Sequence, residues 1–256
     1  MADIIEEFGD GVLRVTLNQT DRGNALNEAS IDKLTEIISS LAGNPSIKAM
    51  VLSGAGDRAF CTGADLSTGS SFQFDYARPQ LRFAGLLRAA RAATTPLIAR
   101  INGHCMAGGM GLLALCDLAI AVDHAKLALP EVKVGVFPMM VISELQHLIG
   151  KRKLYELCLL GRPMTAAEAV SAGLVNVACP ASELDRHVDG MLSEILEKSP
   201  VVVSRGLYAL KRVEALSFEE SISFTESQIG LLAMTEDSKE GLAAFREKRK
   251  PVWTGR

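Results

Sequence analysis

Glu131 is the residue whose type and surroundings best suit proton transfer. It follows Leu129 and Pro130 in an apolar run that predicts a strand end, and the stretch from Val134 to Val141 is apolar again. Burial disfavours the charged form of a carboxylate, so we expect a pKa raised toward the range useful for taking and returning a proton. Taken alone, a glutamate in such a segment is more commonly an exposed loop residue. The assignment of Glu131 as a base therefore needs evidence from other segments.

Two glycine-rich segments supply that support. Residues Thr62 to Leu66 and Ala107 to Gly109 are rich in small side chains, which let backbone N–H groups approach a ligand closely. The second segment also opens a predicted helix, where unpaired N–H groups and the helix dipole favour negative charge. Two such donors converging on one point would form an oxyanion hole, whereas either segment alone predicts no more than a structural turn.

Other patterns of chemical interest are weaker. Gly54 to Ala59 has the spacing of a dinucleotide fingerprint, but the following residues do not propagate the helix that the fingerprint requires. The sequence has no nucleophile elbow, zinc-binding H-E-x-x-H or phosphate-loop motif, so hydrolase, metalloprotease and NTPase interpretations lack support. We expect His104 to be a hydrogen-bonded structural residue and Asp117 to cap a helix-to-strand junction.

The elements that must position these residues alternate in the first half of the chain. Residues 4–8 and 12–17 predict a hairpin, and Asn27 is the predicted cap of a helix. A long loop over 53–71 is of the kind that compact domains use for function. Further strands are predicted at residues 49–52, 97–99 and 118–122. This alternation of strands and helices predicts an α/β fold of parallel or mixed sheets with crossover helices.

Helices dominate the second half. Only Leu174 to Ala178 still predicts a strand, and the last third is helical with many exposed-looking apolar positions. We divide the chain into residues 1–199, a core, and residues 200–256, a helical region that either covers its own core or forms an oligomer interface. Two helices are predicted to start with capping boxes, at Thr165/Glu168 and Ser217/Glu220.

The composition excludes several classes of protein. The chain has 256 residues, 48% of them hydrophobic, which is ample for a core, and its net charge of −3 lacks the positive excess that nucleic-acid binding requires. The five cysteines form no C-x-x-C pair, so we expect reduced core residues. The acidic N-terminus is unlike a signal peptide, and charges and glycines interrupt the most apolar stretch. We expect no membrane span and a cytoplasmic location.

Taken together, these segments resemble the crotonase superfamily, the enoyl-CoA hydratase/isomerase family, nearly from end to end. Asn24 to Asn27 is similar to the family's first CoA-contacting turn, and Ala59 to Leu66 to its signature A-F-x-x-G-A-D-[LI]. Asn102 to Gly109 is similar to the segment N-G-x-x-x-G-G-G, and Leu129 to Glu131 to the strand end that bears a catalytic glutamate. Phe245 to Pro251 resembles the closing signature. The combination is highly specific.

The resemblance implies a spiral of ββα units followed by a C-terminal helical region that trimerises, often with two trimers stacked as a hexamer. It implies an acyl-CoA substrate, with coenzyme A entering as part of that substrate and with no separate cofactor or metal. The N–H groups of Ala64 and Gly108 would polarise the thioester carbonyl while Glu131 acts on the acyl chain. Residues implied in binding the substrate and its CoA moiety are Arg22, Ala25, Leu26, Gly63, Asp65, Leu66 and Lys248, the last from its own or a neighbouring subunit.

Two departures from the family pattern bear on the reaction. Hydratases of the family carry a second glutamate two residues after the glycine triplet, where this chain has Gly111, and the stretch Pro138 to Ile142 is bulkier than its glycine-rich counterpart. Hydration divides its work between two carboxylates, whereas moving a double bond between the 3- and 2-positions needs one base. Our first interpretation is therefore an enoyl-CoA isomerase acting through Glu131.

Two alternatives stay open. A hydratase acting on an unusual acyl group would take its second acid from elsewhere, such as Glu144 or Asp75. A non-catalytic acyl-CoA-binding protein would keep the fold without turnover, although Glu131 beside both predicted oxyanion donors argues against it. The acyl group itself is not encoded in a recognisable motif. Candidates for a tail pocket, each more commonly a core residue, are Phe72, Phe74, Phe83, Met139 and Met140.

Overall fold

The computed structural model describes residues 2–65 and 80–256, and the strands in this part of the chain form two sheets. The six-stranded sheet has the order β1-β2-β3-β5-β7-β10, and the four-stranded sheet has the order β4-β6-β8-β9. The strands of the larger sheet are β1 (Ile4–Gly9), β2 (Val12–Leu17), β3 (Ala49–Gly54), β5 (Leu97–Ile101), β7 (Leu118–Val122) and β10 (Val177–Cys179). Those of the smaller sheet are β4 (Ala59–Cys61), β6 (His104–Met106), β8 (Lys126–Ala128) and β9 (Met164–Thr165).

The chain alternates between the two sheets. Strands β3, β5 and β7 of the larger sheet continue through short turns into β4, β6 and β8 of the smaller one. The chain reaches the larger sheet again at β5 and β7, after α2 and α3, and at β10, after α4, α5, β9 and α6. Neighbours from β2 to β10 in the larger sheet, and from β4 to β8 in the smaller sheet, are parallel, whereas β1 and β9 each pair antiparallel. This repeat confirms the predicted spiral of ββα units.

Helices cover the sheets, and several begin where the sequence predicts. The Asn27 side chain accepts the Ser30 N–H at 2.8 Å at the start of α1. The capping boxes predicted at Thr165 and Ser217 are both present. The helices of the core are α1 (Glu28–Ser40), α2 (Arg82–Ala92), α3 (Gly108–Ala114), α4 (Ile142–Leu148), α5 (Lys151–Leu160), α6 (Ala166–Ser171) and α7 (Leu184–Leu196).

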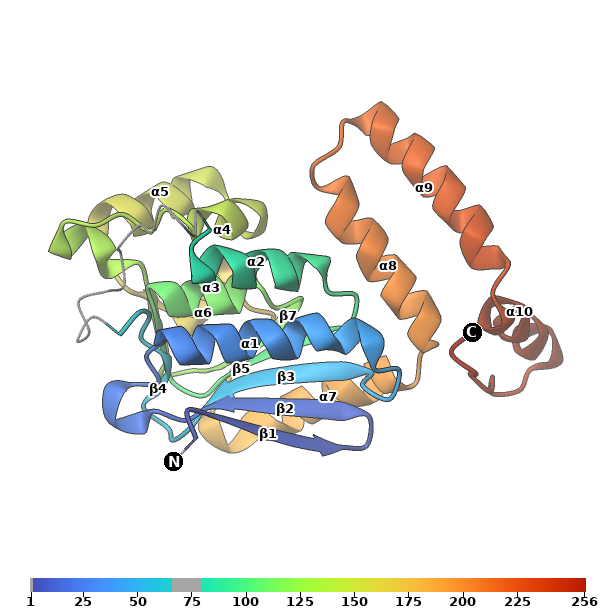
Figure 1. Ribbon diagram of the computed structural model, residues 1–256, viewed down its shortest axis with the longest axis horizontal. Helices are drawn as coiled ribbons and strands as arrows, with labels where there is room; N and C mark the ends of the chain where they lie inside the picture. The colour runs from blue at the N-terminus through green and yellow to red at the C-terminus, as the bar shows by residue number, and fades with distance from the viewer. Residues whose placement is uncertain (1, 66–79) are drawn as a thin grey trace.

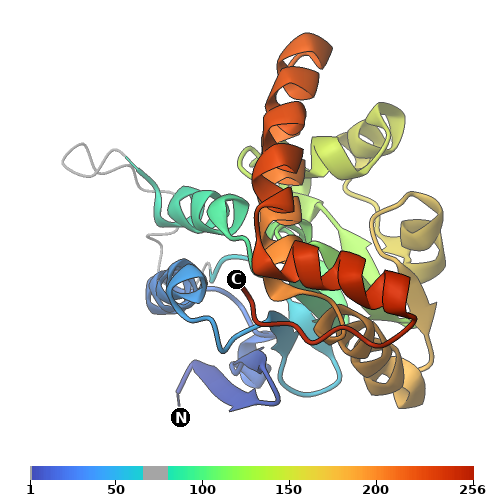
Figure 2. The same ribbon diagram turned by 90° about the vertical axis from the view of Figure 1, so that its right-hand side faces the viewer.

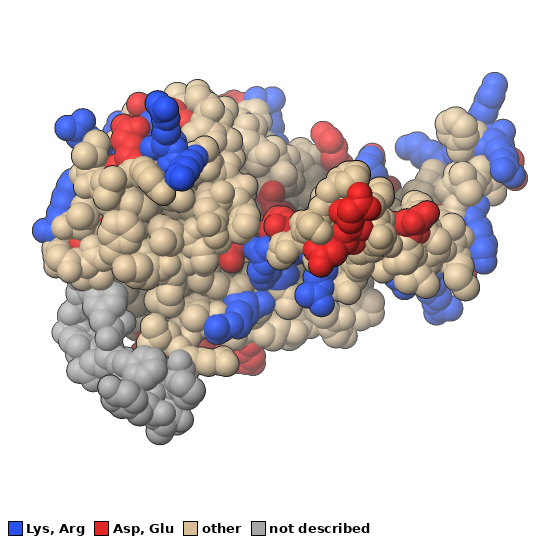
Figure 3. Space-filling view, turned by 90° about the horizontal axis from the view of Figure 1, so that it is seen from above, with Lys and Arg blue, Asp and Glu red and all other residues tan. Residues whose placement is uncertain are grey.

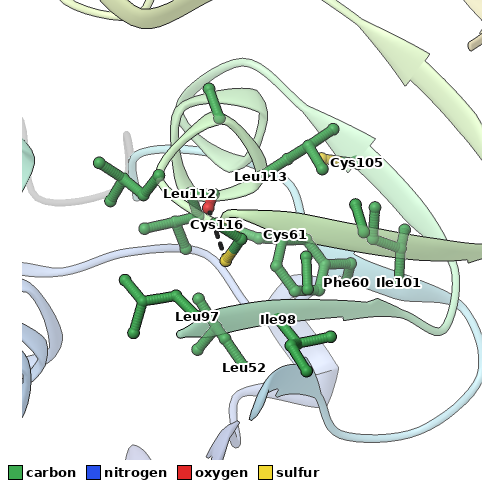
Figure 4. Close-up of a cluster of buried hydrophobic side chains, with 14 of the residues drawn as sticks. Leu52, Phe60, Cys61, Leu97, Ile98, Ile101, Cys105, Leu112, Leu113 and Cys116 are labelled. Carbon is green, nitrogen blue, oxygen red and sulfur yellow. Dashed lines mark hydrogen bonds between the residues drawn. The ribbon is translucent and has the colours of Figure 1, made fainter. Parts of the chain in front are cut away.

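The core lies between α3 and the strands beneath it. Phe60 of β4 is fully buried among leucine and isoleucine side chains from β3, β5 and α3 (Figure 4). Cys61 and Cys105 are register partners in the neighbouring strands β4 and β6, and Cys116 donates a hydrogen bond to the Leu112 carbonyl. All five cysteines are buried free thiols, as predicted, and burial raises the pKa of the Cys61 thiol to about 12.

The loop predicted over 53–71 and the strand predicted over 174–178 differ from the structure. The loop expected over 53–71 is interrupted, because Ser53 and Gly54 extend β3 and residues 59–61 form β4. Residues 66–71 of that loop lie outside the described part of the chain. The strand expected at Leu174 to Ala178 starts only at Val177, because Leu174 donates its N–H to the Ala169 carbonyl and closes the end of α6.

Asp117 also differs from its prediction. One carboxylate oxygen accepts the N–H of Leu97, at the start of β5, and the other lies 3.0 Å from Nζ of Lys211. Its role is structural, as expected, but it joins separate elements rather than capping its own junction. His104 meets its structural prediction, because its Nδ1 accepts the N–H of Lys126 at 3.2 Å.

The last three described helices form an arm that extends from the sheets (Figures 1 and 2). They are α8 (Pro200–Val213), α9 (Phe218–Ala233) and α10 (Glu236–Glu247). Neither α8 nor α9 buries a residue completely within the chain, and large apolar side chains stay exposed along the arm, including Leu210, Phe218, Ile222, Ile229, Met234, Leu242 and Phe245. An exposed apolar surface of this kind is typical of an interface with another protein.

The charged side chains form no single-signed surface in the view from above. Lys and Arg lie interspersed with Asp and Glu on that face, leaving aside the grey atoms (Figure 3). This mixture agrees with the net charge of −3. None of the helices in the described residues is long and apolar enough to cross a membrane.

Candidate active site

Ala64, Gly108 and Glu131 follow the ends of neighbouring strands. They lie two or three residues beyond the last residues of β4, β6 and β8, which run side by side in the parallel orientation. Parallel strands end at the same edge of a sheet, and ligands of α/β proteins commonly bind beyond that edge. The fold therefore gathers the two predicted oxyanion donors and the predicted base at one edge of the smaller sheet.

The segments that carry the two donors touch. A Cβ atom on Gly63 would lie 2.9 Å from the Gly108 nitrogen, and a Cβ atom on Gly108 would lie 3.6 Å from the Ala64 nitrogen. Gly63 also has a φ of +95°, which residues with side chains rarely adopt. Glycine at position 63 thus lets the two N–H groups become neighbours.

Both N–H groups are available to a ligand. Within residues 2–65 and 80–256 neither the Ala64 nor the Gly108 N–H donates to the protein's own backbone. Gly108 is the first residue of α3, where the N–H has no acceptor within the helix. The preceding residue, Ala107, has φ 51° and ψ −122°, a strained conformation for a residue other than glycine that is held in part by its bond to the Ala128 carbonyl at 2.9 Å.

The predicted CoA-contacting turn, residues 24–27, pairs with the segment that carries the Ala64 N–H. Leu26 donates its N–H to the Gly63 carbonyl at 2.7 Å and accepts the Asp65 N–H at 2.8 Å. Arg22 Nη1 lies 2.6 Å from Oδ2 of Asp65, whose side chain is buried while that of Arg22 is mostly exposed. Ala25 is buried within the same turn. The structure therefore places Arg22, Ala25, Leu26, Gly63 and Asp65 together beside the donors.

Two buried asparagines hold these segments in place, and the sequence interpretation assigned a role to neither side chain. Asn24, at φ 57°, donates through Nδ2 to the carbonyls of Ala55 and Ala59. Asn102 donates to the Gly56 carbonyl at 2.7 Å and accepts the Gly54 N–H at 3.0 Å. The only sequence signal for them was their place within the two family motifs, because their partners lie far along the chain.

Glu131 lies in a short 3₁₀ helix, η4 (Pro130–Val134), rather than at the predicted strand end. Pro130 begins this helix and Gly135, in the left-handed conformation, ends it. The Oε2 atom of Glu131 is buried and has no hydrogen-bond partner among the described residues. Burial raises the pKa of the Glu131 carboxyl, in the predicted direction. A buried carboxylate oxygen without a partner is expected where a ligand or a transferred proton supplies one.

Known proteins match this chain over its whole length. The family profile described as "Enoyl-CoA hydratase/isomerase" matches residues 7–256. The chain belongs to the enoyl-CoA hydratase/isomerase family. The Mycobacterium tuberculosis protein named "Probable enoyl-CoA hydratase echA8" is 36% identical over 256 residues, which cover 99% of this chain and 98% of that protein. The "2,3-dehydroadipyl-CoA hydratase" of Escherichia coli is 31% identical, with both chains fully covered.

Solved structures of the family share the fold. The crystal structure of an enoyl-CoA hydratase from Mycobacterium smegmatis superposes with a TM-score of 0.93 at 30% identity, covering 99% of each chain. The fold is therefore that of a crotonase, and the chain is a crotonase-type enzyme. These likenesses leave hydration and isomerisation as alternatives.

The position of the family's second glutamate is closed by apolar side chains. A Cβ atom on Gly111 would lie 2.7 Å from Cζ of Phe83 and 3.3 Å from Cγ2 of Val141. Glu144, one of the acids considered as a substitute, is largely buried in an ion pair with Arg91 at 3.2 Å. Asp75, the other candidate, lies outside the described residues. Apart from Asp65, which is paired with Arg22, the described part of the site thus presents one carboxylate at the strand edge, that of Glu131.

The remaining site candidates are spread more widely. Lys248 ends α10, at the opposite end of the molecule from β4 and α3 (Figure 1), so the structure does not bring it together with the predicted donors of the same chain. Met139 is 68% exposed, and Met140 is partly buried against the core. Leu66, Phe72 and Phe74 lie outside the described residues.

Proposed function

We propose that this enzyme binds an enoyl-CoA thioester and moves its double bond from the 3-position to the 2-position, with Glu131 as its only acid–base group. Two observations together carry the proposal. One carboxylate oxygen at the site has no partner in the described part of the chain, and the position of the family's second glutamate is filled by apolar side chains. Glu131 Oε2 has no partner among the described residues, while Phe83 and Val141 fill the space beside Gly111. A reaction that needs a single base fits this arrangement.

The reaction follows from the groups at the strand edge. The thioester oxygen accepts the N–H groups of Ala64 and Gly108, which polarise the carbonyl and acidify the protons on C2. Glu131 removes one C2 proton, and the negative charge moves onto the thioester oxygen as a dienolate. The same carboxyl, now protonated, returns the proton to C4, so that the double bond lies between C2 and C3 and Glu131 is again ionised.

The CoA moiety is proposed to lie along the paired segments. Arg22 is exposed at the side chain and held by Asp65, so it presents a positive charge beside the turn of Ala25 and Leu26. Lys248 of a neighbouring subunit would add a second positive charge near the CoA phosphates. The exposed apolar arm supports the trimer or hexamer in which that lysine would come close.

Hydration is the second candidate, because the relatives described above are named hydratases. Hydration would require a second carboxylate to activate water. Because Gly111 occupies the position of the family's second glutamate, that carboxylate would have to come from elsewhere. Asp75 is the remaining candidate from the sequence.

The test is product identification with a panel of 3-enoyl-, 2-enoyl- and branched acyl-CoAs. We expect the native enzyme to convert 3-enoyl to 2-enoyl thioesters faster than it hydrates 2-enoyl thioesters. Glu131→Gln should bind acyl-CoA and lose turnover, whereas Glu194→Gln, an exposed acid of α7, should behave as the native enzyme. Efficient hydration without isomerisation would contradict the proposal.

A further inference from the structure

Gly111 lies about one helical turn after the predicted oxyanion donor Gly108 in α3. The two residues are three positions apart in α3, so they share one face of that helix. Gly111 is buried although it has no side chain, because Phe83 from α2 and Val141 before α4 pack onto it. A phenyl ring and an isopropyl group therefore form a wall within one helical turn of the N–H that would hold the thioester oxygen.

The ring is held from both ends of its helix. Next to Phe83, Arg82 pairs with Asp32 and with Glu28 of α1, the latter at 3.3 Å. At the other end of α2, Nζ of Lys211 binds the carbonyls of Ala90 and Ala93 at 3.2 and 3.0 Å. These contacts tie α2, the helix that carries Phe83, to α1 and α8.

The wall offers nothing to hold a water molecule. An ordered water in a protein needs two to four polar partners, and a ring and a methyl group supply none. A water that is not oriented beside C3 cannot attack it efficiently, whereas proton transfer between C2 and C4 requires no water.

We propose that Phe83, packed on Gly111 together with Val141, determines reaction specificity by excluding water from the reacting carbons. The inference rests on the proposed function and deepens it, since it assigns the choice between isomerisation and hydration to a named side chain. The Phe83 ring also selects substrates whose acyl group is apolar near the reacting carbons, because a polar substituent placed against the ring would lose its hydrogen bonds with water.

The experiment compares product ratios in Phe83→Ala and the native enzyme. We expect the ratio of hydration to isomerisation to rise at least tenfold in Phe83→Ala, while Phe8→Ala, which removes an exposed ring from β1, leaves the ratio unchanged. Val141→Ala opens the same wall from the other side and should raise the ratio in the same direction. If Phe83→Ala does not fold, the result from Val141→Ala decides.

A double variant sharpens the test. Gly111→Glu alone should be blocked by the ring, whereas Gly111→Glu combined with Phe83→Ala gives the carboxylate room and should hydrate faster than either single variant. An unchanged product ratio in both wall variants would overturn the role of Phe83 and leave the isomerase proposal standing. A native enzyme that hydrates without isomerising would instead overturn the proposed function itself.

Discussion

Gly63 packs directly against Ala107, so that a Cβ atom on Gly63 would lie 2.7 Å from the Cβ of Ala107. The contact joins the loop after β4 to the strained residue that precedes α3, and these are the segments that carry the Ala64 and Gly108 N–H groups. The spacing of the two donors therefore depends on the absence of a side chain at position 63.

Gly63→Ala should separate the two donors. Its methyl group would displace Ala107, and the φ of +95° adds strain of about 1–3 kcal/mol. Loss of one oxyanion donor typically lowers kcat by about 10²–10³, and we expect a decrease of that size. Gly190→Ala in α7 is the matched control, because its Cβ would meet nothing within 4 Å and should raise stability by about 0.5–1 kcal/mol. Turnover and thermal unfolding of both variants check this prediction.

Gly108→Pro should remove one donor without removing a hydrogen bond of the fold. Proline is well tolerated at the first position of a helix, which Gly108 occupies in α3. We expect a decrease in kcat of about 10²–10³ with the far-ultraviolet circular dichroism of the native protein. A crystal structure with a bound acyl-CoA whose thioester oxygen points away from Ala64 and Gly108 would show that these N–H groups have another role.

The pH dependence of the reaction and of stability should move in opposite directions. Because the pKa of the Glu131 carboxyl is raised, turnover should fall as the pH drops through that raised value and the base becomes protonated. The folded state holds this proton more tightly than the unfolded chain, so the carboxyl lowers stability as the pH rises from the ordinary glutamate pKa through the raised one.

Glu131→Gln should therefore be more stable than the native enzyme at neutral pH and equally stable below pH ~4, the ordinary range of a glutamate. Denaturant titrations at both pH values measure this, and a less stable variant at neutral pH would be inconsistent with the buried, unpartnered Oε2 atom of Glu131.

Arg22→Ala should weaken binding of the CoA moiety alone. We expect KM to rise several-fold for an acyl-CoA and to stay unchanged for the same acyl group on pantetheine, which lacks the nucleotide and its phosphates. Arg152→Ala on α5 is a control for the loss of one positive charge. Equal effects on both thioesters would place Arg22 outside the CoA site.

The arm should assemble the enzyme into a trimer or hexamer. Ile229 is 64% exposed on α9, and an aspartate there would place a charge in an apolar interface. We expect light scattering to give a trimer or hexamer for the native protein and smaller species for Ile229→Asp, with Phe8→Asp as the control at an exposed position of β1. A native protein that stays monomeric at micromolar concentration would rule out the interface.

The sequence was informative where signals are local. The Asn27 cap and the hairpin of β1 and β2 depend on neighbouring residues, and both are present as predicted. Ala64, Gly108 and Glu131 could be singled out because each stands just beyond a strand and belongs to a recognisable motif. That these three residues lie at one edge of the smaller sheet is a consequence of parallel pairing among β4, β6 and β8.

Long-range contacts could not be predicted in the same way. The packing of Phe83 onto Gly111 joins two helices through residues far apart in the chain, and no local pattern marks it. The ion pair of Asp117 with Lys211 likewise depends on where the last turn of α8 lies relative to the core. The apolar neighbours of Glu131 predict a strand end, whereas Pro130 and Gly135 favour the 3₁₀ turn that the structure contains.

The most direct test of a single-carboxylate isomerase is to follow 3-enoyl- and 2-enoyl-CoA thioesters with native enzyme and Glu131→Gln by NMR and mass spectrometry. We expect the native enzyme to convert the 3-enoyl to the 2-enoyl thioester and to hydrate the 2-enoyl thioester more slowly. Glu131→Gln should lose isomerisation and retain acyl-CoA binding. Full activity in Glu131→Gln, or efficient hydration by a native enzyme that does not isomerise, would contradict a single-carboxylate isomerase.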